Sequence, residues 1–301
     1  MRLNPGVTLE RADQVLRRAE NTWSNARSMQ NEWEGYTTAV HDTYNMLKQT
    51  FATPDFGPSL LSPVYWNLLG LGHQTLGVFT DPLQAEAQMR NYRARTMAIR
   101  TEIENQFTAM EQARVELEAL KELGERPGLP IVYDTNMLLH WQQAGDIKWR
   151  EVLKEQGETE LVTRLVVPLT VLDELDRQKY GQGELGKKAA TVIRYLDRTL
   201  KDAAPGAPVE LRSGVTLEVW LDTDERGEDA DLSILRCAAD LDGLHPTTGA
   251  RVLTGDIGMR LRAGQMRLKT VRLPEAHRKK GTALDIGAGA DGLPSGSPGS
   301  S

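Results

Sequence analysis

Four acidic residues stand at the ends of short apolar runs in the second half of the chain. Asp134 closes the run Leu-Pro-Ile-Val-Tyr, and Asp256 closes Arg-Val-Leu-Thr-Gly. Glu174 follows a longer apolar run, and Asp231 opens Leu-Ser-Ile-Leu. Short β-branched runs are typical of buried parallel strands, and ligands of open α/β sheets collect beyond the carboxyl ends of such strands. Four carboxylates meeting there would repel one another unless a divalent cation held them, which points to metal-dependent hydrolysis.

The four stretches that carry these acids resemble the motifs of one family. They are Ile-Val-Tyr-Asp-Thr-Asn, Val-Pro-Leu-Thr-Val-Leu-Asp-Glu-Leu-Asp, Asp-Ala-Asp-Leu-Ser-Ile-Leu and Leu-Thr-Gly-Asp-Ile-Gly-Met-Arg-Leu-Arg-Ala. Residues 130–273 resemble a PIN domain, the nuclease fold related to the flap endonucleases. The resemblance implies a Mg²⁺- or Mn²⁺-dependent endoribonuclease that acts on single-stranded RNA. It does not cover residues 1–129 or the tail.

The resemblance also implies which residues act. Its motifs match Glu174 to the metal-facing acid of its helix, whereas Asp173 and Asp176 are expected to be solvated or paired with Arg177 or Lys179. The expected catalytic and metal-binding acids are Asp134, Glu174, Asp231 and Asp256.

The third acidic position is open between two residues. Aligning the apolar residues that follow favours Asp231 as the ligand and places Asp229 at the helix N-cap, a position that aspartate prefers. Both carboxylates can nevertheless approach a metal from the first turn of one helix, so Asp229 stays among the candidate ligands.

Four residues are candidates for substrate binding. Asn136 either anchors the loop after Asp134, contacts a scissile phosphate, or simply caps a helix. Thr254 can hydrogen-bond a metal ligand or a bound water. Arg260 and Arg262 can hold a substrate phosphate or form salt bridges with nearby acids.

The charge distribution bears on nucleic-acid binding. The chain has a formal net charge of −6, yet residues 251–280 carry nine Lys or Arg against two acids. A second basic group follows Glu174, between Arg177 and Arg198. Phosphate binding favours such clusters, so both are candidate RNA tracks, although a solvated helix face balanced by nearby acids is the alternative.

The remaining composition narrows the chemistry and the compartment. The five histidines show no paired spacing, which disfavours zinc and leaves oxygen ligands suited to Mg²⁺ or Mn²⁺. The single cysteine, Cys237, fits a reducing compartment. No apolar stretch approaches the roughly 20 residues of a membrane span, and no secretory signal is evident at the N-terminus. These features predict a cytoplasmic protein with no membrane contact.

The pattern of elements predicts an α/β fold after an all-α N-terminal domain. Strands are expected near 130–134, 163–168, 216–220, 250–254 and 269–273, with helices between them and a parallel sheet covered on both faces. The strand near 216–220 alternates and reads as a sheet edge. We expect a helical accessory domain over 1–129, a PIN-like nuclease domain over 130–275, and a disordered tail over 276–301 rich in Gly, Ala, Ser and Pro.

Within the N-terminal region two long helices are expected. The first covers residues 8–50 and is interrupted or bent at Gly35, and the second runs from Pro82 to about Leu123, with short helices over 51–80 between them. They can pack against each other or against a second copy, and partner binding, dimerisation and RNA positioning are all open roles for this region. RNA is the expected substrate. A catalytically silent PIN module that binds RNA or protein is the main alternative.

Overall fold

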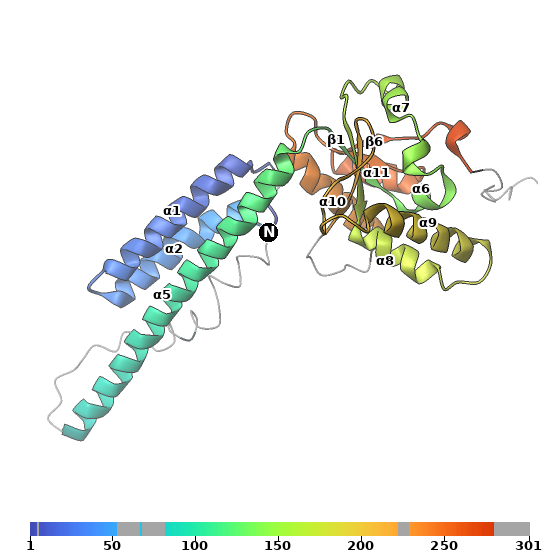
Figure 1. The fold of residues 1–301 in the computed structure, drawn as a ribbon. Coiled ribbons are helices and arrows are strands. Elements are labelled where there is room, and N and C mark those ends of the chain that lie inside the picture. Colours follow the sequence, from blue (N-terminus) through green and yellow to red (C-terminus); the bar gives the residue numbers. More distant parts are fainter. Residues whose placement is uncertain (5, 53–66, 68–81, 222–228, 280–301) are drawn as a thin grey trace, which may run out of the picture.

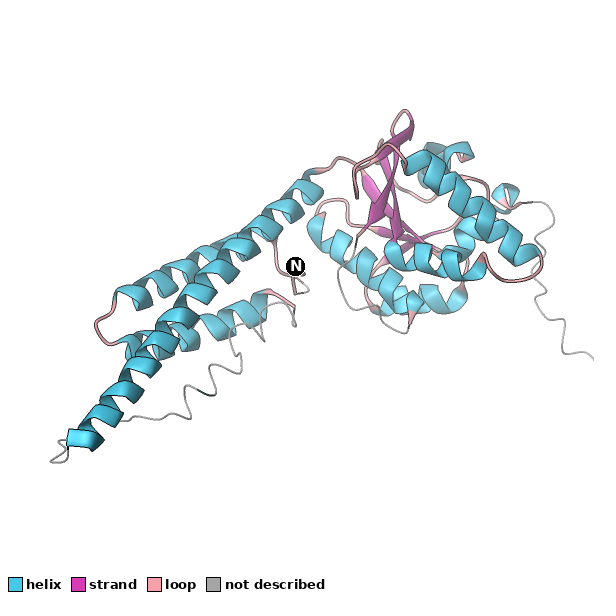
Figure 2. Ribbon diagram, turned by 60° about the horizontal axis from the view of Figure 1, so that its bottom comes forward, coloured by secondary structure: helices cyan, strands magenta, loops and turns pink. Residues whose placement is uncertain are grey.

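The computed structural model describes residues 1–4, 6–52, 67, 82–221 and 229–279. An N-terminal helical region leads into an α/β region, and the two diverge from a junction near residue 126 (Figures 1 and 2). Each region has its own cluster of buried apolar side chains. Nowhere in the described part of the chain is there a helix with the length and apolar character needed to span a bilayer.

Among the described residues of the N-terminal region, three helices pack together: α1 (Leu9–Ser28), α2 (Glu32–Thr50) and α5 (Pro82–Glu125). The second predicted helix, from Pro82, is confirmed as α5, but the stretch predicted as one bent helix is two helices that pack as a hairpin. The helices predicted over 51–80 lie almost entirely outside the described residues.

Gly35 was expected to interrupt the first helix, and that prediction was wrong. The chain turns at residues 29–31, where the Asn31 side chain caps α2 by accepting the Glu34 N–H, and Gly35 lies inside the first turns of α2. A Cβ at Gly35 would lie 2.9 Å from the carbonyl oxygen of Ala26. The missing side chain therefore lets α2 approach α1 closely.

The α/β region contains a six-stranded sheet in the order β3-β4-β2-β1-β5-β6. Every neighbouring pair is parallel except β3 with β4. The predicted α/β fold class is confirmed. The strands are β1 (Leu129–Tyr133), β2 (Thr163–Pro168), β3 (Val209–Arg212), β4 (Val215–Trp220), β5 (Arg251–Leu253) and β6 (Lys269–Val271).

Helices follow the strands and cover the sheet. Those that bear on the site are α6 (Thr135–His140), α8 (Leu169–Gln178), α9 (Glu184–Leu200), α10 (Ala230–Leu244) and α11 (Ile257–Gln265); α7 (Trp149–Glu155) and the short helices η1 (Ala144–Asp146) and η2 (Glu275–His277) complete the region. Residues 276–279 of the predicted tail are ordered, since Arg278 forms a β-bridge with Trp141. The rest of that tail lies outside the described residues.

The prediction that residues 216–220 form an edge strand was wrong. β4 lies between β2 and β3, and the sheet edge on that side is β3, a strand that was not predicted. β3 has only four residues, and none of them is fully buried, so it offers no apolar run to recognise. Residue 218, which should face solvent in the alternating pattern, is a buried glutamate.

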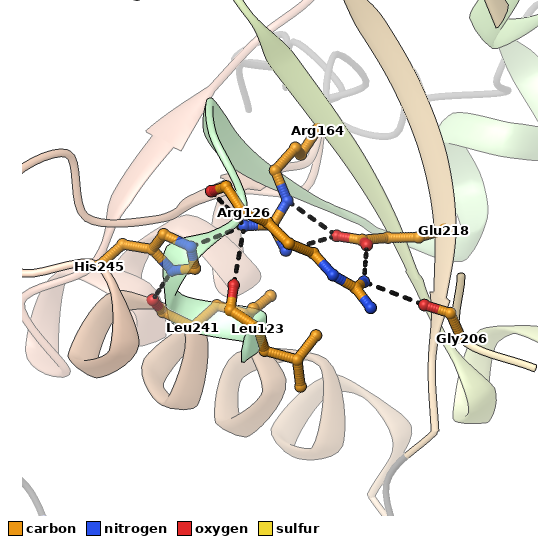
Figure 3. Close-up of polar contacts among 7 residues, drawn as sticks. All are labelled: Leu123, Arg126, Arg164, Gly206, Glu218, Leu241 and His245. Atoms are coloured by element: carbon orange, nitrogen blue, oxygen red, sulfur yellow. Dashed lines mark hydrogen bonds and ion pairs between the residues drawn. The ribbon is translucent and has the colours of Figure 1, made fainter. Parts of the chain in front are cut away.

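A buried polar network joins the end of α5 to the sheet (Figure 3). Arg164 on β2 is 2% exposed and donates to Glu218 on β4 over 3.0 and 2.7 Å. Its Nη1 also contacts the carbonyl oxygens of Leu123 and Arg126, at 3.5 and 3.3 Å, and His245 Nε2 at 2.6 Å. Because α5 has no basic residue in its last turn, Arg164 supplies the cation at that helix end.

Candidate active site

Asp134 is placed by the end of the central strand. Its side chain is buried, and Oδ1 accepts the Asn136 N–H at 3.2 Å as the N-cap of α6. Oδ2 accepts the hydroxyl of Thr254 at 2.7 Å. Both carboxylate oxygens are therefore held by the backbone of one loop and the side chain of another.

Glu174 is held from two sides on α8. The hydroxyl of Thr135 donates to its Oε2 at 2.6 Å, and the amide of Gln178, one turn further along α8, donates to Oε1 at 3.2 Å. Asp176 on the same helix pairs instead with Lys179 at 2.6 Å, as predicted. Glu174, the acid chosen from the family resemblance, is thus the one that contacts Thr135 just after the end of β1, whereas Asp176 contacts Lys179.

At the start of α10 the two candidate aspartates take different positions. Asp229 is the N-cap, accepting the Leu232 N–H at 3.2 Å, as predicted. Asp231 lies in the first turn and accepts from Arg262 at 2.7 Å, while the same guanidinium lies 3.6 Å from Asp229. Arg262 therefore forms a salt bridge, which was one of its two predicted roles.

Asp256 lies after the end of β5, two residues beyond Thr254. It is the exposed N-cap of α11, and its carboxylate accepts the Met259 N–H at 2.8 Å. Its own backbone N–H donates to Thr254 Oγ1 at 3.0 Å, the hydroxyl that in turn donates to Asp134. The Thr254 hydroxyl thus links the carboxylate of Asp134 to the backbone N–H of Asp256.

Two of the predicted acids act on the carboxyl of Asp134. Burial is the largest cause that raises the pKa of the Asp134 carboxyl, and the carboxylates of Asp231 and Glu174 raise that pKa further. Hydrogen bonds from Thr254 and from the Asn136 N–H oppose the shift. Asp134 therefore lies in the field of the Glu174 and Asp231 carboxylates.

These acids suit a metal ion because of their donor atoms and their charge. Hard oxygen donors suit Mg²⁺ and Mn²⁺, and the field on Asp134 favours a cation. Among the residues that the structure describes, however, no three His, Cys, Asp or Glu side chains are grouped closely enough to hold a metal. Each of the four acids is engaged by a hydroxyl, an amide, a guanidinium or a backbone N–H.

Of the remaining predicted substrate residues, Asn136 is exposed beside Asp134, and Arg260 Nε donates to the carbonyl oxygen of Asp256 at 3.3 Å.

The basic stretch 251–280 is not one surface. Arg251 is buried and pairs with Glu158 at 2.5 Å, and Lys279 Nζ donates to the carbonyl oxygens of Leu138 and Leu139. Including Arg251 in an RNA track was therefore wrong.

Two residues that hold the site were not predicted in that role. Gln178 lies four residues after Glu174, a spacing that brings side chains together on a helix and could have suggested the contact. For Thr135, nothing in the local sequence indicates a hydrogen bond to a residue 39 positions away.

Comparisons with known proteins identify the region of the chain that carries the four acids. A comparison with curated proteins gives no match. One similar solved structure is a domain of a functionally unknown protein from Methanocaldococcus jannaschii DSM 2661, with 18% identity over 52% of this chain and 99% of that one and a TM-score of 0.32. The PIN domain family model matches residues 131–273, a span that includes all four acids. Residues 131–273 of this chain therefore belong to the PIN domain family.

Proposed function

We propose that this protein is a Mg²⁺- or Mn²⁺-dependent endoribonuclease that hydrolyses phosphodiester bonds in single-stranded RNA. The observation that carries the proposal is the position of Asp134. It is a buried carboxylate beyond the carboxyl end of the central strand of a PIN domain, and two further carboxylates oppose its ionisation. Buried like charges of this kind favour a cation among them.

In this proposal Asp134, Glu174 and Asp231 hold the cation. When bound, a divalent ion supplies charge stabilisation at phosphoryl oxygens and a water of lowered pKa. The protein supplies orientation, because Thr254 fixes Asp134 and Thr135 fixes Glu174 by hydrogen bonds of 2.7 and 2.6 Å. Such supporting contacts typically matter 10- to 100-fold for metal affinity or activity.

Residues around these acids have roles in binding substrate. Asn136 is exposed beside Asp134 and is placed to meet a phosphate, and Arg260 lies on the first turns of α11 behind Asp256. Asp256, whose backbone N–H donates to the Thr254 hydroxyl, is proposed as a further acid of the site. A reducing compartment such as the cytoplasm is the proposed location, since Cys237 is buried and free.

The test compares two carboxylates on one helix. Glu174→Gln should abolish cleavage of a labelled single-stranded RNA pool in Mg²⁺ or Mn²⁺, while Asp176→Asn, which removes only a surface partner of Lys179, should cleave like the wild type. EDTA should stop both active proteins. Equal cleavage by Glu174→Gln and the wild type would refute the proposal.

A catalytically silent PIN module is the second candidate. It is favoured by the Arg262–Asp231 ion pair, in which a protein cation already neutralises one of the acids. RNA binding without cleavage in any divalent ion would support this module over the nuclease.

A further inference from the structure

The N-terminal part of α5 extends beyond the rest of the helical region. The ion pairs Arg27–Glu104 and Arg100–Glu32, with N···O distances of 3.0 and 2.6 Å, mark the outer end of the α1–α2 hairpin along α5. Residues 82–94, which we call the α5 arm, continue past it for about 20 Å at 1.5 Å per residue. The arm forms the free end of the molecule in Figures 1 and 2.

The arm is exposed and basic. Between 82 and 94 every residue except Gln88 is exposed. Residues 82–100 contain four arginines and one glutamate, whereas residues 101–125 contain seven glutamates against one arginine and one lysine. This order is the reverse of the one that stabilises a helix, which has acids near the N-terminus and bases near the C-terminus. The charge of the arm is therefore not explained by helix stability.

Two arginines of the arm carry charges that no acid in the described residues neutralises through an ion pair. Arg90 and Arg93, three residues apart on one helix face, form no ion pair with any residue in the described ranges, even though Glu86 lies one turn from Arg90. Between them Tyr92 leaves 37% of its surface exposed, and the Arg95 guanidinium lies 5.7 Å from the centre of its ring. Arginines that alternate with an exposed aromatic ring suit a polymer of phosphates and bases.

The arm is also fixed in direction relative to the sheet. Arg164 binds the carbonyl oxygens of Leu123 and Arg126 at the other end of α5, and Arg126 itself pairs with Glu218 (Figure 3).

We propose that the α5 arm binds the phosphate backbone of single-stranded RNA through Arg90 and Arg93. This inference rests on the proposed function for the identity of the polymer, but RNA binding by the arm requires neither a metal nor cleavage. A second copy of this chain is the competing occupant, because the acidic half of another α5 would also complement the arm.

The test measures binding separately from catalysis. Fluorescence anisotropy with a labelled 30-nucleotide single-stranded RNA in EDTA compares the full-length protein with Arg90→Gln/Arg93→Gln. The matched control is Arg11→Gln/Arg18→Gln, two exposed arginines on α1 of the same region. Loss of two phosphate contacts should raise Kd about tenfold near 0.1 M salt. It should also lower the slope of log Kd against log salt by about 1.4, at about 0.7 per contact.

Each outcome decides the inference. The inference is upheld if Kd and the salt slope change in the arm variant while the control stays close to the wild type. A lack of cleavage by every protein would refute only the proposed function and would leave this inference standing. Equal Kd values in the arm variant, the control and the wild type overturn it, even if the wild type cleaves RNA. A wild-type dimer by light scattering that the arm substitutions convert to monomer, with unchanged Kd, overturns it in favour of the second copy.

Discussion

Arg164→Met should destabilise the protein severely, because it removes one member of a buried ion pair. The side chains of Arg164 and Glu218 are 2% and 4% exposed, and Arg164 also binds two carbonyl oxygens and His245. Removing one partner of such a pair typically costs about 3–5 kcal/mol, since the other charge stays buried. At about 3 °C per kcal/mol for this size, the Tm should fall by roughly 10 °C.

The assay is urea and thermal unfolding followed by tryptophan fluorescence, with Trp149 buried in the α/β core and Trp23 in the helical core. The control is Glu32→Gln, which removes an ion pair whose arginine is 69% exposed and should cost under about 1 kcal/mol. The double variant Arg164→Met/Glu218→Met should recover much of the lost stability, because it leaves no unpaired charge. A cost for Arg164→Met no larger than that of the control would refute this reasoning.

Three further predictions follow from single contacts. His245 donates from Nδ1 to the carbonyl oxygen of Leu241 and accepts at Nε2 from Arg164, and burial lowers its pKa below the ordinary 6.5. The unfolded chain therefore binds a proton that the folded one excludes, so the free energy of unfolding should fall as the pH drops below about 6.5. Urea midpoints at pH 7.5, 6.5 and 5.5 measure this, and a flat series contradicts it. Gly35→Ala should cost about 1–3 kcal/mol from its 2.9 Å clash, whereas Gly243→Ala on α10, with nothing within 4 Å, should be neutral or stabilising in the same unfolding assay. Thr135→Val should lower cleavage 10- to 100-fold with an unchanged Tm, because it frees Glu174; full activity would show that the hydrogen bond has no such role.

Much of the site could be read from local sequence. A buried strand that ends in aspartate has few alternative meanings, so the positions of Asp134 and of the Asp229 N-cap were both foreseen. The family resemblance supplied Glu174, which a helix with three acids in four residues does not single out by itself.

What the sequence could not supply depends on long-range contacts. Residues 216–220 were taken as an edge strand, because Arg164, the partner of the buried Glu218, lies 54 residues away on another strand. Arg251 looked like part of a basic surface because Glu158, its partner, is 93 residues away. Gly35 was read as a break because the close approach of α1 that requires a glycine is visible only in the packed hairpin.

The side-chain partners of the acids were likewise hidden. Each carboxylate was expected to turn toward a common centre, and the structure shows that Asp231 meets Arg262 and that Asp256 caps its own helix. Whether a divalent ion displaces such contacts depends on the balance between its attraction to the carboxylates and the hydrogen bonds it replaces. Sequence patterns do not contain that balance.

Titration of Mn²⁺ into the full-length protein, read by the loss of its free electron paramagnetic resonance signal, tests the shared carboxylate site most directly. We predict saturable binding in the wild type and in Asp176→Asn, and loss of that binding in Asp134→Asn. Equal Mn²⁺ binding by Asp134→Asn and the wild type would contradict the assignment of Asp134, Glu174 and Asp231 to a metal site.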